Sequence, residues 1–175
     1  EKIVEVCEKV SADVGAVQAV NFNCPGQIVI AGTMAGVEKA AALLGEAGAK
    51  KSVILPVSAP FHSTLMQPAA EKLAVELDKV EIRDAKIPVV ANVSAEILTK
   101  AADIKESLVK QAASPVKWED CVEKMKEFGA DTFVEAGPGK TLCGFNKRID
   151  RKLTSMNVEN LETLQKTLDY FKEVR

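Results

Sequence analysis

The sequence predicts an α/β protein with two subdomains, a small one over residues 1–57 and a large one over residues 58–175. Two observations support this fold class. Before residue 58 the expected order is helix, strand, hairpin strand, helix and strand. After it, strands alternate with helices, a pattern typical of a mostly parallel sheet with helical cover. The hydrophobic content of 47% is enough for a packed core in a chain of 175 residues.

The small subdomain is predicted to be ferredoxin-like, a βαββαβ unit that lacks only its first strand. Its expected elements are a helix over residues 3–14, strands over 16–23 and 27–31, a helix from Thr33 to about Gly48, and a buried strand over Ser52–Val57. Thr33 is the expected N-cap of its helix, and Gly15 ends the helix before the hairpin. Because the chain opens at Glu1 without methionine and inside a helix, we expect a fragment of a longer protein.

The large subdomain is predicted from apolar residues whose spacing switches between helical and extended periods. Its expected elements are helices over about 63–80, 104–112, 117–128, 142–149 and 159–172, with strands over 89–93 and 132–135. Pro60 prevents a regular strand from continuing far past Val57, and Ser63 is expected to cap the helix that follows.

Charge and composition exclude several classes of function. The formal net charge is −2, with charged residues spread along the chain, which argues against a nucleic-acid-binding protein. No apolar run approaches the roughly 18 residues that span a membrane. The four cysteines form no C-x-x-C pair and only one histidine is present, so neither a zinc site nor a disulfide framework is indicated. We expect a cytoplasmic monomer that binds no metal, nucleic acid or membrane.

His62, the only histidine, is the first candidate for a catalytic residue. It lies where the strand Ser52–Val57 should end and the next helix should begin. Loops at such junctions carry chemistry in α/β proteins, and the ordinary pKa of a histidine side chain suits acid and base catalysis near neutral pH. From position alone, a structural histidine remains the alternative.

A histidine base needs a group to activate, and the sequence contains no Gly-x-Ser-x-Gly elbow that would present a reactive serine. Ser63 adjoins His62 and is therefore poorly placed for a nucleophile-to-base hydrogen bond. The segment Gly137-Pro138-Gly139-Lys140-Thr141 is similar to a phosphate-binding loop but has Val134 where that motif needs glycine, so we interpret it as a tight strand-to-helix turn. Any nucleophile is expected outside this chain.

Three stretches together resemble one family, the malonyl-CoA:acyl carrier protein transacylases of fatty acid synthesis. They are Asn21-Phe22-Asn23-Cys24-Pro25-Gly26-Gln27, Ala59-Pro60-Phe61-His62-Ser63-Thr64-Leu65-Met66 and Glu135-Ala136-Gly137-Pro138-Gly139-Lys140. Their order and spacing fit the family over essentially the whole chain. The resemblance implies an α/β-hydrolase-like large subdomain into which the ferredoxin-like subdomain is inserted, with the N-terminal part of the large subdomain absent from this sequence.

The resemblance also implies a reaction, in which a serine takes malonyl from coenzyme A as an ester and passes it to the phosphopantetheine thiol of acyl carrier protein. His62 matches the family's catalytic histidine, which deprotonates the serine and protonates the departing thiolate. Gln111 matches the residue whose main-chain carbonyl orients that histidine. Asn21 and Asn23 match a turn of the family motif beside the cleft between the subdomains, where the resemblance implies contact with the thioester or pantetheine. The family's serine, oxyanion-hole glutamine and malonyl-binding arginine lie upstream of Glu1, so the fragment alone is expected to be inactive.

Three further residues are expected to contact substrate or partner. Phe61 adjoins the base and is expected to meet the acyl group and to favour malonyl over methylmalonyl, unless it only packs under the His62 loop. Lys50 and Lys51 are expected to hold the acidic carrier protein. The coenzyme A thioester is a substrate in this reaction, and no cofactor is expected. Two other functions stay open, a non-catalytic domain that binds acyl carrier protein and an acyltransferase domain of a polyketide synthase.

Overall fold

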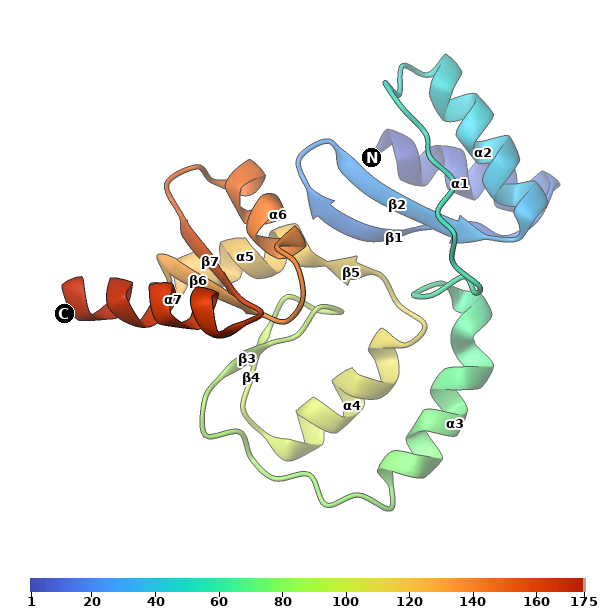
Figure 1. Ribbon diagram of the computed structural model, residues 1–175. Helices are drawn as coiled ribbons and strands as arrows, with labels where there is room; N and C mark the ends of the chain where they lie inside the picture. Colours follow the sequence, from blue (N-terminus) through green and yellow to red (C-terminus); the bar gives the residue numbers. More distant parts are fainter. Residues whose placement is uncertain (175) are drawn as a thin grey trace.

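The first four elements pack around a two-stranded hairpin, as the sequence predicts. The computed structural model describes residues 1–174. It begins with α1 (Lys2–Asp13), β1 (Val17–Cys24), β2 (Gln27–Gly32) and α2 (Met34–Glu46), shown in blue to cyan in Figure 1. Thr33 is the N-cap of α2, because its hydroxyl accepts a hydrogen bond from the backbone N–H of Gly36 at 3.2 Å. Gly26 turns the hairpin with a φ of 76°, which glycine adopts without steric cost.

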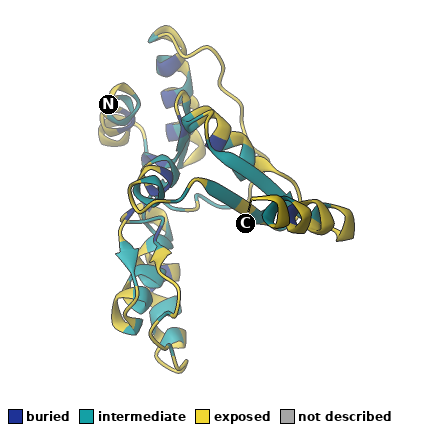
Figure 2. Ribbon diagram, turned by 90° about the vertical axis from the view of Figure 1, so that its left-hand side faces the viewer, coloured by how far each residue is buried: buried dark blue, intermediate teal, exposed yellow. Residues whose placement is uncertain are grey.

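The core of this unit lies between β1 and the two helices. Val17 of β1 is only 1% exposed and packs in one cluster with Cys7, Val10 and Ala40. Figure 2 shows buried positions of this kind, in dark blue, along the helices of the unit. The prediction of a helix, hairpin and helix is therefore confirmed, and apolar burial on one face of each element accounts for it.

The expected buried strand over Ser52–Val57 is wrong. This segment is extended but pairs with no strand in the described part of the chain, and it forms a single strip between α2 and the turn before α3 (Figure 1). Its apolar side chains are between 48% and 63% exposed, at Val53, Ile54, Leu55 and Val57. The local composition suits a strand, but a strand also needs a neighbouring backbone with which to form hydrogen bonds. Within residues 1–174, no strand pairs with this segment.

The remaining elements follow the predicted order, with additions. They are a 3-10 turn η1 (Thr64–Met66), α3 (Gln67–Leu77), β3 (Val89–Val90), β4 (Ile97–Leu98), α4 (Ala101–Gln111), β5 (Val116–Lys117), α5 (Trp118–Glu127), β6 (Thr132–Ala136), α6 (Thr141–Ile149), β7 (Thr154–Val158) and α7 (Leu161–Glu173). All five expected helices are present within a few residues of the predicted bounds. The strand expected over residues 89–93 is only two residues long, and the sequence analysis missed β4, β5 and β7.

The strands form three small sheets instead of the mostly parallel sheet that the sequence predicts. The first has the order β2-β1-β5, and β1 runs antiparallel to β2 and parallel to β5. The other two are the antiparallel pair β3-β4 and the parallel pair β6-β7. The prediction of one mostly parallel sheet was therefore wrong for residues 1–174, where parallel pairing is limited to β1 with β5 and β6 with β7.

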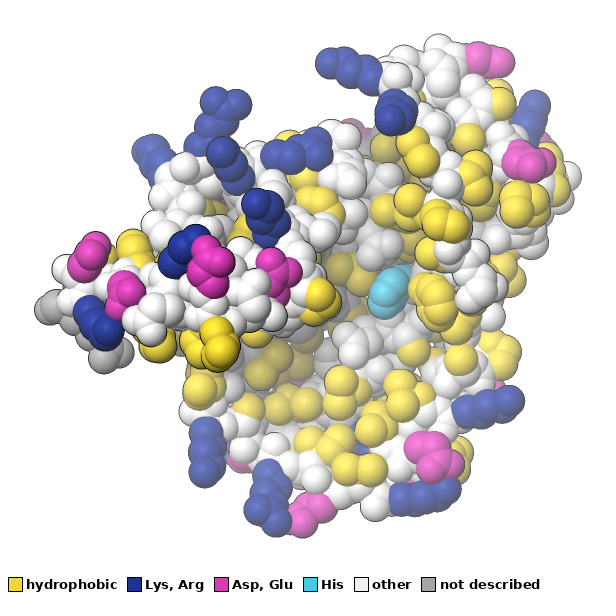
Figure 3. Space-filling model, viewed as in Figure 1, with side chains coloured by type: hydrophobic (Ala, Val, Ile, Leu, Met, Phe, Trp, Pro, Cys, Tyr) yellow, Lys and Arg dark blue, Asp and Glu magenta, His cyan; other side chains and the backbone are white. Residues whose placement is uncertain are grey.

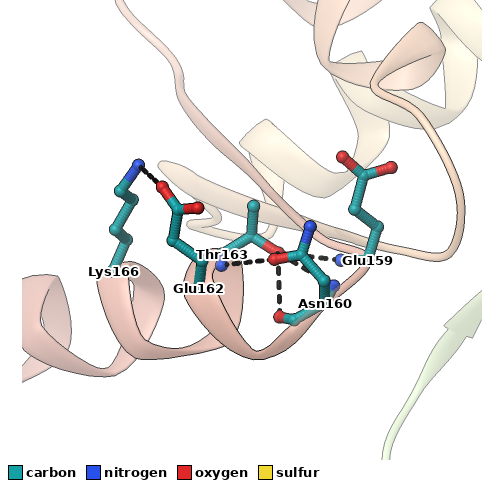
Figure 4. Close-up of polar contacts among 5 residues, drawn as sticks. All are labelled: Glu159, Asn160, Glu162, Thr163 and Lys166. Carbon is teal, nitrogen blue, oxygen red and sulfur yellow. Dashed lines mark hydrogen bonds and ion pairs between the residues drawn. The ribbon is translucent and has the colours of Figure 1, made fainter.

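The last helix begins with a capping box. Asn160 Oδ1 accepts from the N–H of Thr163 at 3.0 Å, and Thr163 Oγ1 accepts from the N–H of Asn160 at 3.1 Å (Figure 4). Glu162, in the same first turn, forms an ion pair with Lys166, four residues later. The reciprocal bonds satisfy N–H groups that the first helical turn leaves unpaired. Within residues 1–174, every helix is too short or too polar to traverse a lipid bilayer.

Candidate active site

The ring of His62 lies in the turn before α3 and contacts the end of α4. Its Nδ1 is 2.9 Å from the main-chain oxygen of Gln111. Gln111 is the last residue of α4, where helix carbonyls have no partner within the helix. The structure therefore brings together the two residues that the resemblance pairs, although they are 49 positions apart in the sequence.

This contact determines which nitrogen of the neutral ring carries the proton. A carbonyl oxygen can only accept a hydrogen bond, so Nδ1 of His62 donates to Gln111 and holds the hydrogen. The other nitrogen, Nε2, then keeps its lone pair. An imidazole oriented in this way can take a proton from a hydroxyl or thiol at Nε2 and return it later.

The backbone of His62 is held in the left-handed region, with a φ of 63°. For a residue other than glycine this conformation costs roughly 1–2 kcal/mol, so neighbouring contacts must maintain it. Ser63 supplies two of them, since its N–H and its hydroxyl donate to the oxygen of Pro60 at 3.3 and 2.6 Å. The expectation that the Ser63 side chain caps the next helix is wrong, because the hydroxyl is used inside the turn.

The surface around the imidazole is hollowed and largely apolar. Figure 3 shows the histidine (cyan) inside a recess, with hydrophobic side chains (yellow) around it. Phe61, next to it in sequence, is 49% exposed. An apolar flank beside an oriented base is suited to a short acyl chain.

Asn21 and Asn23 lie on β1 and are half-buried. The pairing of β1 with β2 shifts register around both, so that Asn23 has no partner across the hairpin. Such bulges redirect side chains and occur next to active sites. Neither side-chain amide hydrogen-bonds to His62 in the described part of the chain, whose ring contact is with Gln111.

Lys50 and Lys51 are exposed and begin the extended segment that connects α2 to the turn of His62 (Figure 1). The side-chain hydrogen bonds of that turn to other elements, within residues 1–174, go to Gln111 and Gln18 and involve neither lysine. The role of these lysines in holding a partner protein stays a prediction.

Within residues 1–174, no hydroxyl or thiol forms a hydrogen bond with the imidazole of His62, and no group of three or more His, Cys, Asp or Glu side chains could hold a metal ion. Burial, and to a smaller extent the charge of Asp120, raises the pKa of Cys121 to about 11. Burial and the neighbouring Glu135 raise the pKa of Cys143 to about 11. Both thiols are therefore protonated at neutral pH and are poor nucleophiles.

Glu135 organises the turn that the sequence analysis distinguished from a phosphate-binding loop. Its carboxylate accepts from the N–H groups of Leu142 and Cys143 at 3.1 and 2.9 Å, at the start of α6. The N–H of Gly139 in the same turn donates to Glu159 at 2.7 Å. Carboxylates thus occupy donors that a phosphate would need, and the interpretation as a strand-to-helix turn is confirmed.

Two features near the site were missed from the sequence. Gln18 of β1 contacts the turn of His62 through Thr64, at a sequence distance that no local pattern reveals. Arg148 of α6 donates to Gln27 and to the carbonyl of Pro25, and so ties the hairpin to the C-terminal half of the chain. Lys147, Arg148 and Arg151 form an exposed basic surface that lines an open recess. The consecutive basic residues Lys147 and Arg148 in an amphipathic helix were the sequence signal for this surface.

The comparisons with known proteins agree with one another. A family model described as "Acyl transferase domain" matches residues 3–169. The malonyl CoA-acyl carrier protein transacylase of Bacillus subtilis is 48% identical over 173 residues, which make up 99% of this chain and 55% of that protein. The corresponding Escherichia coli K12 protein is 46% identical over 153 residues, 87% of this chain and 49% of its own. The chain thus spans about half the length of the curated relatives it matches.

Solved structures match to the same extent. The malonyl CoA-acyl carrier protein transacylase of Clostridium perfringens superposes with a TM-score of 0.93 at 44% identity, covering 99% of this chain and 54% of that one. A malonyl-transacylase solved in complex with a type II PKS acyl-carrier protein superposes with a TM-score of 0.92 at 41% identity, covering 96% and 54%. The α/β fold of the chain is therefore that of these structures over about half their length.

Proposed function

The chain belongs to the acyl transferase domain family and is a homologue of malonyl CoA-acyl carrier protein transacylases over about half their length, and on this basis we propose that it supplies the base for malonyl transfer. The proposed reaction moves malonyl from coenzyme A to the phosphopantetheine thiol of acyl carrier protein through a seryl ester, in cytoplasmic fatty acid synthesis. The proposal puts the serine outside residues 1–175, so that this stretch alone is inactive.

The single observation that carries the proposal is the 2.9 Å contact between His62 Nδ1 and the carbonyl of Gln111. With Nδ1 donating, Nε2 takes the hydroxyl proton while the serine oxygen attacks the thioester carbonyl. When the C–S bond breaks, Nε2 gives that proton to the coenzyme A thiolate. In the second half-reaction Nε2 takes the proton of the carrier thiol while its sulfur attacks the ester carbonyl. When the C–O bond to the serine breaks, Nε2 returns the proton to the serine oxygen. The Gln111 carbonyl stabilises the imidazolium formed in each half.

The substrate and partner assignments rest on the relatives and on the shape of the site. One of the matching structures is a malonyl-transacylase in complex with an acyl-carrier protein, which supports a carrier as the acceptor. The apolar recess and the exposed ring of Phe61 support an acyl group beside His62. We assign Asn21 and Asn23 to contacts with the thioester or its pantetheine arm, from the bulged strand β1.

The finer architecture is part of the same proposal. We assign residues 1–57 to a ferredoxin-like subdomain and residues 58–175 to the C-terminal part of an α/β-hydrolase-like subdomain. The α1–β1–β2–α2 arrangement supports the first assignment. The parallel pair β6-β7, followed by α7, supports the second, since α/β-hydrolase-like folds are built from parallel strands and helices.

His62→Asn in the full-length protein tests the function more sharply than an alanine variant. Asparagine tolerates a left-handed backbone and its amide can still donate to Gln111, but it cannot act as a base. We expect malonyl transfer to both thiol acceptors to fall by roughly 10²- to 10⁴-fold. The free energy of unfolding should stay within about 1 kcal/mol of the wild-type value. Transfer rates and urea denaturation measure the two effects.

His62→Ala is the companion variant, and it should lose the same activity with a somewhat larger loss of stability. Retained turnover in either variant would contradict the assignment of His62 as the base. A full-length protein that binds acyl carrier protein equally well with and without His62, and transfers no malonyl in its wild-type form, would instead support a non-catalytic carrier-binding domain.

A further inference from the structure

The position of His62 depends on contacts from outside its own turn. Inside the turn, Ser63 bonds to Pro60, which sets the local shape. The turn has three longer-range hydrogen bonds, one from His62 to Gln111 and two from Thr64 to Gln18. The first orients the ring, and those to Gln18 anchor the backbone two residues after the base.

A single atom of Gln18, its side-chain oxygen, anchors the backbone at Thr64. This Oε1 atom accepts from the backbone N–H of Thr64 at 2.7 Å and from the Thr64 hydroxyl at 2.9 Å. Thr64 begins the 3-10 turn η1, whose own N-cap residue, Ser63, makes no side-chain capping bond. Gln18 therefore satisfies an N–H at the start of a helix in the way that a capping residue does, but from another element.

The strand that presents Gln18 is firmly held. Its neighbours Val17 and Ala19 are both buried, and β1 is paired on both sides, with β2 and with β5. The Ser11 hydroxyl also bonds to the N–H and the carbonyl of Val17, each within 2.9 Å. Because the strand is rigid, a side chain on it can hold the strained turn in one position.

We propose that Gln18 is a positioning residue that sets the place of the His62 imidazole by anchoring Thr64 to β1. The inference rests on the proposed function, because it assumes that His62 is the base. A displacement of about 1 Å at a reacting group can cost roughly a hundredfold in rate, so loss of the anchor should lower turnover without changing substrate contacts. Gln18 acts through the turn and touches no reacting atom.

The test compares Gln18→Leu, Gln18→Glu and Gln67→Leu in the full-length protein. Leucine removes the acceptor at similar size, whereas glutamate keeps an oxygen that can accept both bonds. Gln67 is the matched control, since it is exposed, lies three residues after Thr64 and has no side-chain hydrogen bond in the described part of the chain. The measurements are kcat and KM for malonyl-CoA, the melting temperature, and the ¹⁵N signals of the His62 ring, identified by their loss in His62→Asn.

We expect Gln18→Leu to lower kcat roughly tenfold with KM unchanged within twofold, and to shift the His62 ring signals. Gln18→Glu should restore most of kcat, and Gln67→Leu should change nothing. Thr64→Val removes one of the two hydrogen bonds to Gln18 and should give a smaller loss of kcat. If Gln18→Leu does not fold, this variant tests the proposal in its place. A change in melting temperature alone, with kcat and ring signals unmoved, would overturn the proposal.

The ring signals separate this inference from the proposed function. If the wild-type protein transfers no malonyl, the function fails, but a shift of the His62 signals in Gln18→Leu would still support the anchor. If the wild-type protein is active and the ring signals do not respond to Gln18→Leu, the anchor is rejected and the function stands.

Discussion

Under the proposed function, we expect Phe61 to select between acyl groups. This residue is half exposed and directly precedes His62 in the sequence, and methylmalonyl carries one methyl more than malonyl. One methyl in a shaped pocket is worth about 1–3 kcal/mol, or roughly 10- to 200-fold in specificity. We expect Phe61→Ser in the full-length protein to shift the ratio of kcat/KM toward methylmalonyl thioesters by about tenfold.

The control for this prediction is Phe128→Ser, which removes an exposed ring at the end of α5. It should leave the ratio of the two kcat/KM values as in the wild type. An unchanged ratio in Phe61→Ser as well would make Phe61 a structural residue.

At the residue scale, the sequence identified one pair of contacting residues, His62 and Gln111, through the family resemblance, but not the other contacts of the turn. His62 was found because it is the only histidine and lies in a recognisable stretch, and Gln111 because of its position relative to the same family pattern. The left-handed backbone of His62 and the anchor from Gln18 could not be found, because they depend on contacts between distant parts of the chain. The role of Ser63 was misjudged, since a serine before a helix has two competing uses for its hydroxyl.

Glu135 should stabilise α6 by capping its first turn. Burial alone would raise the pKa of this carboxyl, but the N–H groups of Cys143 and Leu142 donate to it and the pKa is lowered overall. We expect Glu135→Ala to reduce the free energy of unfolding by about 1–2 kcal/mol near neutral pH, measured by urea denaturation. Glu135→Gln keeps an acceptor without the charge and should cost less.

The same capping interaction predicts a dependence on pH. Because the pKa in the folded state is below its ordinary value of 4.5, the stabilisation is present above pH 4.5 and is lost as the pH falls through the folded-state pKa. The stabilities of the wild type and Glu135→Ala should therefore converge in acid. A constant difference at every pH would show that the alanine variant loses packing and not a charged cap.

At the element scale, helices were easier to predict than strands. The helical periodicity is local, so α1 to α7 all have counterparts among the expected helices. The strand β7 has the polar sequence Thr154-Ser155-Met156-Asn157-Val158 and exists because it pairs with β6, which no local pattern reveals. The prediction of a strand over Ser52–Val57 was wrong for the opposite reason. This segment has the composition of a strand, but no strand within residues 1–174 pairs with it.

At the scale of the whole molecule, two groups of exposed basic side chains within residues 1–174 are candidates for contact with the proposed carrier protein. One consists of Lys50 and Lys51, which follow α2, and the other consists of Lys147, Arg148 and Arg151 in and after α6. We expect reversal of the first pair, Lys50→Glu with Lys51→Glu, to raise KM for the carrier more than KM for malonyl-CoA. The effect should shrink at high salt, because charge attraction across an exposed interface is screened.

Lys147→Glu with Arg151→Glu is the matched pair from the other surface. Arg148 is left in place there, because it ties α6 to the hairpin. If only this second pair weakens use of the carrier, the assignment of Lys50 and Lys51 is wrong and the carrier is held at α6. Equal losses for carrier and malonyl-CoA would reject carrier docking at either surface.

We expect the exposed strip over Ser52–Val57 to affect how this stretch behaves at high concentration. An extended backbone with apolar side chains that pairs with no strand within residues 1–174 can serve as a template for self-association into β-type aggregates. Pro56 lies within the strip and has no N–H to contribute to an intermolecular ladder. The charges of Lys50 and Lys51 immediately precede it and repel a second copy. These three residues therefore act as gatekeepers, and they make the strip less able to seed fibrils.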